Sequence, residues 1–245
     1  MRPFAVYPAS FDGSTLGWWR FGERGGRLDS VVAGGPAFTN YGAAPLSDGY
    51  GITFSPNTYL QAPMGSQPAQ SALTLEAWIR SCSVPSVGGY RTLLYYADSV
   101  GHNWVDMLLY RAGANDLRLW GRIALPPPDQ WTVQWADNAA ITALLASPAP
   151  WHVAVVTAAA AQIRLFVNGT LRAETSGAVP TFPAKTMWLD VGCRDSGYGA
   201  TAILDEVRLS AAARYASNFP IVRFGEGRRL GLRGPECLAT AGGIP

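Results

Sequence analysis

The chain has 245 residues, of which 48% are hydrophobic and 15% are charged, and its net charge at pH 7 is +2. A chain of this length buries about 70 to 75% of its unfolded surface, so it can form one large domain without disulfides or metals. Its basic residues are all arginine except Lys185 and form no run of like charges, which argues against nucleic acid as a partner.

The sequence carries no pattern for export or membrane insertion. Its N-terminus lacks a basic segment followed by about 7 to 15 apolar residues, and no stretch approaches the about 20 apolar residues of a membrane span. The three cysteines, Cys82, Cys193 and Cys237, are far apart and lack metal-ligand spacing. We therefore expect no membrane partner, a reduced compartment and no export by the general secretory route.

The predicted elements are short strands. The 27 glycines and 18 prolines punctuate short apolar runs, and the 3.6-residue apolar period of a helix is nearly absent. This pattern predicts an all-β fold, and ten or more strands fit an antiparallel jelly-roll sandwich of two sheets. Strands are expected at residues 16–21, 50–54, 58–62, 73–81, 91–96, 104–111, 116–122, 186–192 and 201–209, besides a hairpin within residues 151–175.

Residues 73–81, LTLEAWIRS, alternate between two kinds of side chain. Successive residues of a strand point to opposite faces, so Leu73, Leu75, Ala77 and Ile79 are expected to face the core. The other face carries Trp78 among charged side chains.

The hairpin prediction rests on Asn168-Gly169, which supplies the two positive-φ positions of a type I′ turn between alternating apolar residues. His152 stands at the start of the preceding strand, and no cysteine, serine or second histidine near it in sequence suggests a nucleophile or a metal site. It is interpreted as a structural imidazole.

The strand expected at residues 201–209 carries two adjacent carboxylates. Alternation places Asp205 with Val207 on an apolar face and Glu206 with Arg208 on the other. Asp205 and Glu206 then point apart and cannot flank one glycosidic bond, which requires carboxyl groups about 5 to 9.5 Å apart across a common cleft. Glu206 and Arg208 are predicted to form a solvated ion pair, whereas Asp205 must accept hydrogen bonds or bind a cation.

The domain is expected to end soon after this strand. Ser210 is predicted to cap a single helical turn at residues 211–215. Residues 1–15 and 220–245 then form Gly/Pro-punctuated arms beyond a domain of residues 16–219. Terminal arms of this kind are either disordered or ordered by neighbouring molecules.

Seven motifs, taken in order, resemble the laminin-G-like, concanavalin-A-like jelly-roll family in the form found in bacterial and bacteriophage proteins. They are LGWWRFGE (16–23), GYGITFSPNTYLQAP (49–63), LTLEAWIR (73–80), PWHVAVV (150–156), IRLFVNGTLRAE (163–174), MWLDVGCR (187–194) and ILDEVRLSAAARY (203–215). The final ARYASNFP is similar to the ends of such domains in phage structural proteins.

The resemblance implies a sandwich of antiparallel sheets whose members mostly bind rather than catalyse. Some related glycoside hydrolases carry Glu-x-Asp-x-x-Glu on one strand, and this spacing is absent here, so no catalytic residue and no enzymatic activity are expected.

Other members of the family hold calcium near the chain ends, and the resemblance implies Asp205 with Glu23 or Asp29 as its ligands. The alternative is that Asp205 accepts backbone N–H groups, and the arginines within residues 21–30 would repel a cation. No other cofactor is expected.

Residues 124–149 form an insertion where the family has a short turn. It contains Trp131 and Trp135 among prolines, and three interpretations remain open: a sugar-stacking loop, a contact surface for a neighbouring subunit, or a cover for the edge of the sandwich itself.

Two functions follow as expectations. The first is a non-enzymatic structural protein of a bacteriophage virion, a decoration or accessory protein on the head or tail exterior, assembled in the host cytoplasm with other virion proteins or copies of itself. The second is a carbohydrate-binding module for bacterial surface glycans. The candidate contact residues are the same for both functions: Trp78, Trp104, Trp120, Trp131 and Trp135. They would contact partner proteins in the first function and stack on sugar rings in the second. A glycoside hydrolase, the third alternative, needs two close carboxylates in one cleft.

Overall fold

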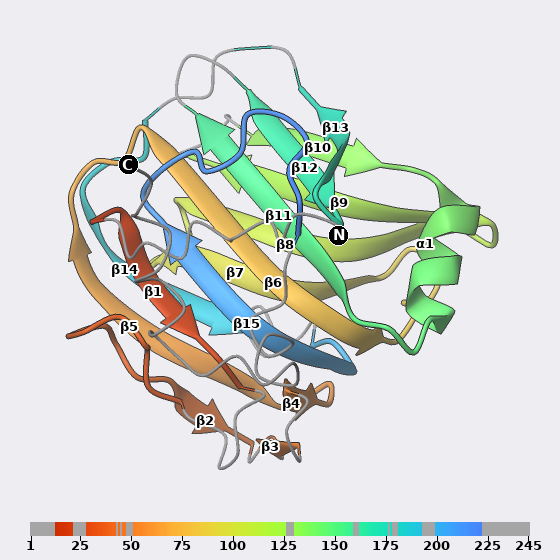
Figure 1. Cartoon of the computed structure of the whole chain (residues 1–245), viewed down its shortest axis with the longest axis horizontal. Coiled ribbons are helices and arrows are strands. Elements are labelled where there is room, and N and C mark those ends of the chain that lie inside the picture. Colours follow the sequence, from red (N-terminus) through yellow and green to blue (C-terminus); the bar gives the residue numbers. More distant parts are fainter. Residues whose placement is uncertain are drawn as a thin grey trace, which may run out of the picture.

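The computed structural model describes residues 13–21, 28–42, 44, 46–47, 51–125, 130–158, 162–175, 177, 181–192 and 199–221. Over these residues the chain forms two antiparallel β-sheets packed face to face and one short helix (Figure 1). The predicted all-β, two-sheet jelly-roll sandwich is confirmed. Most of the two predicted arms, residues 1–12 and 222–245, lies outside the described residues.

The first sheet has eight strands in the described chain. Its order is β13-β12-β11-β6-β15-β4-β3, and β1 pairs with the other part of β15. The bounds are β1 Thr15–Trp19, β3 Leu46–Ser47, β4 Gly51–Phe54, β6 Ala72–Cys82, β11 Trp151–Ala158, β12 Ile163–Val167, β13 Thr170–Glu174 and β15 Ala202–Ser210.

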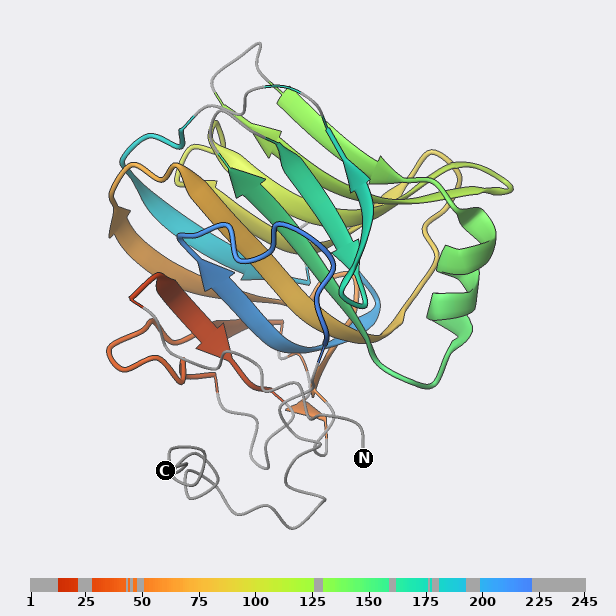
Figure 2. The same cartoon turned by 45° about the horizontal axis from the view of Figure 1, so that its top comes forward.

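The second sheet has seven strands, again within the described ranges, in the order β10-β9-β8-β7-β14-β5-β2. The bounds are β2 Thr39–Tyr41, β5 Tyr59–Gln67, β7 Tyr90–Asp98, β8 Trp104–Gly113, β9 Asp116–Ala124, β10 Gln130–Trp135 and β14 Lys185–Val191. Helix α1, Asn138–Ala146, connects β10 to β11 at one end of the sandwich (Figure 2).

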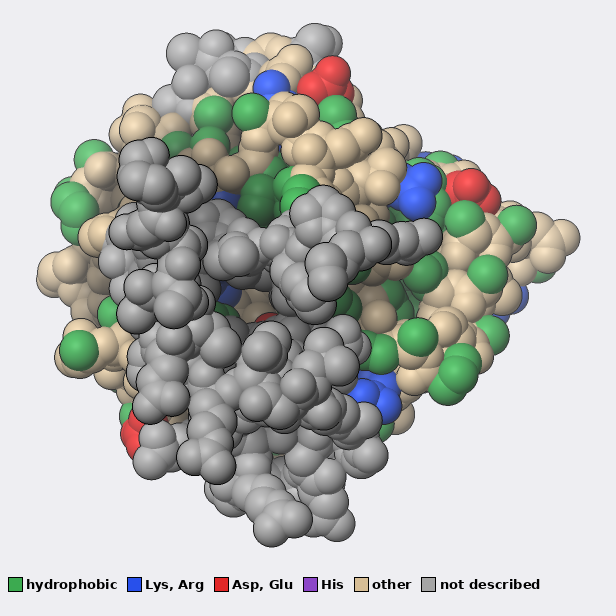
Figure 3. Space-filling view, in the orientation of Figure 1, with side chains coloured by type: hydrophobic (Ala, Val, Ile, Leu, Met, Phe, Trp, Pro, Cys, Tyr) green, Lys and Arg blue, Asp and Glu red, His purple; other side chains and the backbone are tan. Residues whose placement is uncertain are grey.

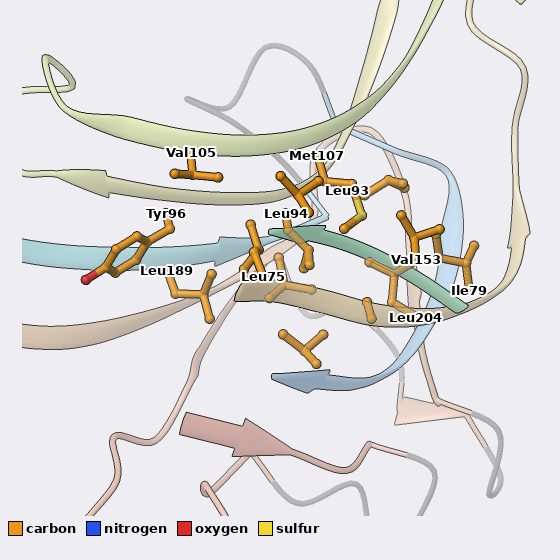
Figure 4. Close-up of a cluster of buried hydrophobic side chains, with 14 of the residues drawn as sticks. Leu75, Ile79, Leu93, Leu94, Tyr96, Val105, Met107, Val153, Leu189 and Leu204 are labelled. Carbon is orange, nitrogen blue, oxygen red and sulfur yellow. The ribbon is translucent and has the colours of Figure 1, made fainter. Parts of the chain in front are cut away.

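The core fills the space between the two sheets (Figure 4). Its driving force is the removal of apolar surface from water, which contributes about 25 cal/mol per Å² of buried apolar area. The predicted inward face of β6 is confirmed, because all four of its apolar residues belong to this core. Facing side chains include Leu75, Ile79, Val153 and Leu204 from the eight-stranded sheet and Leu94, Tyr96, Val105, Met107 and Leu189 from the seven-stranded sheet.

The predicted hairpin turn is present between β12 and β13. Asn168 and Gly169 have φ angles of 51° and 72°, the positive values that a type I′ turn requires. The Asn168 side chain also accepts a hydrogen bond from the backbone N–H of His152 at 2.9 Å, which ties the turn to β11.

The predicted faces of the last strand are correct for Val207 and Arg208 but wrong for Asp205, because β15 contains a β-bulge. Glu206 has a φ of 47°, and the pairing with β6 shifts between Asp205 and Arg208. One extra residue inverts the alternation, so Val207 still reaches the core while Asp205 and Arg208 lie on the outer face, opposite Trp78 and Glu76. Arg208 is buried and bonded to Glu76, so the predicted solvated pair with Glu206 is also wrong.

The chain after β15 crosses the outer face of the eight-stranded sheet without forming the predicted helical turn (Figure 1). We call residues 211–221 the closing segment. The Thr74 hydroxyl donates to the Ala212 carbonyl at 2.6 Å and accepts from the Arg214 N–H at 3.0 Å. Ser210 accepts from the Arg214 side chain at 2.6 Å rather than capping a helix. These bonds to the sheet satisfy the backbone groups that a helix would have paired internally.

The insertion at residues 124–149 is ordered structure over its described part. It forms β10, which adds an edge strand to the seven-stranded sheet, and α1, which places Ile141 in the same core as Val133 and Trp135 of β10. Apolar side chains gather on the surface around α1 (Figure 3). The arrangement favours the interpretation that the insertion covers the edge of the sandwich itself.

Candidate functional site

A row of polar and aromatic side chains crosses the outer face of the seven-stranded sheet. Directly paired residues of antiparallel strands point to the same side. The pairings Asp106–Arg122, Tyr95–Asp106, Tyr95–Asp190 and Asp190–Gln61 therefore align five side chains from β9 to β5. Because neighbouring strands lie about 4.8 Å apart, the row extends over about 19 Å.

Aromatic side chains from three neighbouring strands surround one end of this row. We call Tyr90, Trp104, Tyr110 and Trp120 the aromatic platform. The rings of Tyr110 and Trp120 are 4.3 Å apart between centroids. Trp104 is 7% exposed, whereas the other three rings are half-buried and keep part of their surface accessible. The platform thus offers apolar ring surface beside polar groups.

Arg122 lies at the centre of the platform. Its Cζ atom is 5.9 Å from the ring centroid of Tyr90, 5.1 Å from that of Trp104 and 5.7 Å from that of Trp120, all within cation–π range. Its Nε and Nη2 atoms donate to the two carboxylate oxygens of Asp106 at 3.0 and 2.5 Å. This two-point geometry, with Asp106 fully buried, is the arrangement in which an Arg–carboxylate pair is strongest.

Two further polar features lie on this face beyond the Asp106–Arg122 pair. At the far end of the row, Gln61 Nε2 donates to Asp190 Oδ1 at 3.0 Å. The indole Nε1 of Trp120 is a buried donor with no hydrogen-bond partner among the described residues.

A second aromatic contact marks the opposite edge of the same sheet. The rings of Tyr41 on β2 and Tyr59 on β5 are stacked, with centroids 4.7 Å apart and planes 10° apart. Tyr41 is 40% exposed. The outer face therefore has aromatic side chains over β7–β9 and again over β5 and β2, the kind of surface that suits a ligand with apolar faces. Of the polar side chains between them, Asp106 and Asp190 are buried and Gln61 is half-buried.

The outer face of the eight-stranded sheet holds a different cluster, which we call the buried quartet: Glu76, His152, Arg208 and Tyr215. Arg208 Nε donates to Glu76 Oε1, while Tyr215 Oη and His152 Nε2 lie 2.8 and 3.0 Å from Glu76 Oε2. Arg208 Nη2 also donates to Tyr215 Oη at 2.8 Å. Burial by itself would raise the pKa of Glu76, but the charge of Arg208 and the contact with His152 hold it at about 2.

The buried quartet holds the closing segment in place. Tyr215 and Phe219 stack at 3.6 Å between centroids and pack with Phe166 on β12. Glu76 is 2% exposed, and three side chains contact its carboxylate, so this buried anion joins the closing segment to the sheet. His152 is a structural imidazole, as predicted.

The five predicted tryptophans do not form one surface. The structure brings Trp104 and Trp120 together on the platform. Trp78 lies on the opposite sheet with its ring edge against His152, at 5.5 Å between centroids. Trp131 packs against the core, and Trp135 belongs to it with Arg172 over its ring at 4.9 Å.

Sequence reasoning missed Tyr90, Tyr110, Arg122 and Asp106. The available signal was the alternation in DLRLWGRIA, residues 116–124, which places Trp120 and Arg122 on one face of the strand.

The calcium hypothesis stays a prediction. Asp205 Oδ1 accepts the backbone N–H of Glu206 at 2.8 Å, Asp29 is exposed, and Glu23 lies outside the described residues. In the described part of the chain, no three His, Cys, Asp or Glu side chains are grouped to hold a metal. A melting temperature that falls with chelator in wild type but not in Asp205→Asn would establish the site.

The described chain includes no helix that is both long enough and apolar enough to cross a membrane.

Solved structures with a similar fold include several binding domains. A botulinum neurotoxin type C structure, described as interacting with two ganglioside molecules, superposes with a TM-score of 0.62 and 10% identity over 83% of this chain and 49% of that one. The binding domain of botulinum neurotoxin DC in complex with SialylT superposes with a TM-score of 0.60 and 12% identity, over 82% of this chain and 49% of that one. This chain thus spans about half the length of the neurotoxin chains.

A smaller neighbour is matched over nearly its whole length. This neighbour is domain 4 of AbnA, a GH43 extracellular arabinanase from Geobacillus stearothermophilus, in complex with arabinotriose. It superposes with a TM-score of 0.57 and 11% identity, over 82% of this chain and 93% of that one. At these identities the likeness establishes the fold.

The sequence also matches a family profile. No curated protein matches the chain. The laminin-G-type profile described as the concanavalin A-like lectin/glucanases superfamily matches residues 54–218, which include most strands of both sheets and the buried quartet. The chain belongs to the concanavalin A-like lectin/glucanases superfamily.

Proposed function

We propose that this chain is a non-enzymatic glycan-binding domain whose ligand lies on the outer face of the seven-stranded sheet. The observation that carries the proposal is the aromatic platform beside a cross-strand row of hydrogen-bonding groups. Sugar rings have apolar faces that stack on aromatic rings and hydroxyls that bond to carboxylates, amides and indole N–H groups. The similar domains described with sugar ligands support the same class of ligand.

The charge distribution on this face favours uncharged glycans. Arg122 is bonded to Asp106, and Arg118 is bonded to Asp116 at 2.7 Å, so neither guanidinium needs an anionic ligand for neutralisation. Asp190 would repel the carboxylates of an acidic polysaccharide. We therefore expect binding that changes little with salt, because screening weakens only charge–charge attraction.

Binding without catalysis is favoured by the state of the carboxylates. Asp106 is fully buried and accepts hydrogen bonds from Arg122 through both of its oxygens, so its carboxylate is occupied within the described chain. Glycoside hydrolysis requires one protonated and one ionised carboxyl group on either side of the scissile bond. We expect no reducing ends to be released from any polysaccharide that the chain binds.

The test is an array of neutral and acidic glycans probed with the purified chain. We expect binding to neutral glycans, an affinity loss of about tenfold or more in Trp120→Ala, and retention in Trp120→Phe, which preserves a flat ring. Unchanged binding in Trp120→Ala would place the ligand elsewhere. Binding restricted to acidic glycans, with a strong dependence on salt, would contradict the expected ligand class.

The second candidate function is a structural role on the exterior of a bacteriophage particle, as a decoration or accessory protein of the head or tail. It is supported by the closing motif ARYASNFP, which is similar to the ends of phage structural domains. In this chain Tyr215, Asn218 and Phe219 of that motif bond or pack onto the sheet. The partners would be other virion proteins or further copies of the chain.

Mass spectrometry of density-gradient-purified particles tests this second function. A chain ending at residue 221 keeps every described residue, so we expect it to fold and to fail to incorporate into particles. Trp120→Ala should incorporate normally. If particles never contain the wild-type chain, the structural role is excluded and glycan binding is tested independently.

A further inference from the structure

The aromatic platform is assembled from three strands, so no single strand determines how its rings are arranged. Tyr90 comes from β7, Trp104 and Tyr110 from β8, and Trp120 from β9. Hydrogen bonds within the sheet align the backbones, but each side chain retains its own rotamer choices. A fixed arrangement of several rings is therefore favoured by a group that contacts them together.

Arg122 is that group in the described structure. Its guanidinium lies within 6 Å of the ring centroids of Tyr90, Trp104 and Trp120, one ring from each strand. A planar guanidinium can stack on rings while its edge donates in two directions, which the compact ammonium of lysine cannot do. A change to lysine would therefore keep the charge and lose the shape.

Asp106 fixes the orientation of this guanidinium. It accepts from Nε and Nη2 through its two oxygens, and its side chain is fully buried. Two parallel bonds define the plane of the guanidinium, whereas a single bond would leave it free to rotate.

The backbone of Arg122 is fixed by tight packing behind it. A Cβ atom on the preceding residue, Gly121, would come within 2.7 Å of Val155 on the opposite sheet and within 3.1 Å of Val133 on β10. Glycine lets β9 approach the opposite sheet closely at this point. Arg122 thus projects from a segment that has little room to shift.

We propose that Asp106 and Arg122 act as a positioning pair that holds the rings of the aromatic platform in the arrangement that stacks on a sugar. This inference rests on the proposed glycan-binding function. The pair acts through the rings, so its removal disorders the platform before it removes any direct contact with ligand.

The first readout needs no ligand. Arg122→Lys and Asp106→Asn are compared with wild type by near-ultraviolet circular dichroism and by acrylamide quenching of tryptophan fluorescence. The matched control is Arg164→Lys, which alters a cross-strand Arg–Glu pair on the other sheet, where Arg164 lies 3.4 Å from Glu174. We expect a weaker aromatic dichroism signal and greater quenching in the two platform variants, and wild-type values in the control.

The second readout is affinity for the glycan that the array identifies. We expect Arg122→Lys to lower the association constant about tenfold, the size of a lost desolvated cation–π contact, and Arg164→Lys to leave it unchanged. If Arg122→Lys does not fold, the affinity of Asp106→Asn is compared with that of the control instead. Asparagine preserves the shape of the aspartate side chain and one of its two acceptor oxygens.

The outcomes separate the two proposals. Wild-type spectra and wild-type quenching in both platform variants would overturn the positioning pair. Loss of binding in Trp120→Ala together with full binding in Arg122→Lys would also overturn it, while glycan binding would stand. If wild type binds no glycan, the proposed function fails, and the spectra alone decide whether the pair holds the rings.

Discussion

Arg208 on β15 donates to Glu76 on β6, and this buried ion pair joins two neighbouring strands of the eight-stranded sheet at the point where the closing segment crosses them. Tyr215 of that segment completes the contact by donating to Glu76 and accepting from Arg208. An ion pair removed from water is stable only when its remaining hydrogen-bonding positions are filled. The closing segment fills them and is fastened to the sheet by the same bonds.

Glu76→Gln is expected to destabilise the fold strongly. It leaves the guanidinium of Arg208 buried without its counter-ion, for which the expected loss is about 3 to 5 kcal/mol of unfolding free energy. Urea denaturation measures this loss. The control is Glu174→Gln, which breaks an exposed pair with Arg164 and should cost about 1 kcal/mol or less. Equal losses in the two variants would show that the quartet contributes no more than a surface contact.

Stability is expected to fall in acid because of the same carboxylate. The pKa of Glu76 is about 2 in the folded chain, against 4.5 for the free group. A lowered pKa means that the ionised form stabilises the fold above pH 4.5 and that this contribution is lost as the pH falls toward 2, on the order of 3 kcal/mol in total.

Melting temperatures between pH 6 and pH 2.5 test this pH dependence. Wild type should lose stability over this interval more steeply than Glu76→Gln, which lacks the titrating group. Parallel curves for the two proteins would assign the acid sensitivity to other carboxylates.

The Cys82 thiol is expected to be unreactive in the native protein. Burial raises its pKa to about 12, against a smaller lowering effect of Arg91, so the thiolate that reacts with alkylating agents is scarce at neutral pH. Peptide mapping after iodoacetamide treatment should find Cys82 unmodified in native protein and alkylated in urea. Rapid native alkylation at Cys82 would mean that β6 opens readily.

Gly169→Ala is expected to cost more stability than Gly34→Ala, although the two glycines have φ angles of 72° and 73°. Both changes impose the strain of a left-handed backbone, about 1 kcal/mol or more. Only at Gly169 does the added Cβ also meet a neighbour, the Phe219 carbonyl oxygen at 2.0 Å, whereas the space at Gly34 is open.

The difference between the two melting temperatures isolates the contact between the hairpin and the closing segment. Phe219 N–H also bonds to the Gly169 carbonyl at 2.8 Å, so displacement of the segment would lose this bond as well. Equal melting temperatures would show that the segment moves aside at no cost.

Local sequence pattern was sufficient for most of the strands and for one turn, although it missed β2, β3 and β10. Leu73, Leu75 and Ile79 face the core as their alternation predicted, because the period of a strand is a property of its own backbone. Asn168-Gly169 forms the predicted turn because these residues tolerate positive φ wherever they occur. The tryptophans on the platform, Trp104 and Trp120, were also among the predicted contact residues.

Tertiary structure alone decided which side chains meet. Glu76 and Arg208 are 132 residues apart, and their contact depends on β6 lying beside β15 and on a single extra residue in that pairing. Alternation assigned Asp205 and Val207 to one face, but the extra residue at Glu206 separates them, so Val207 faces the core and Asp205 lies on the outer face. The positions of Trp131 and Trp135 likewise depended on β10 joining the sheet edge. Periodicity determines the two faces of one strand, whereas strand order and register come from packing the whole chain, and the aromatic platform exists only once that packing brings β7, β8 and β9 together.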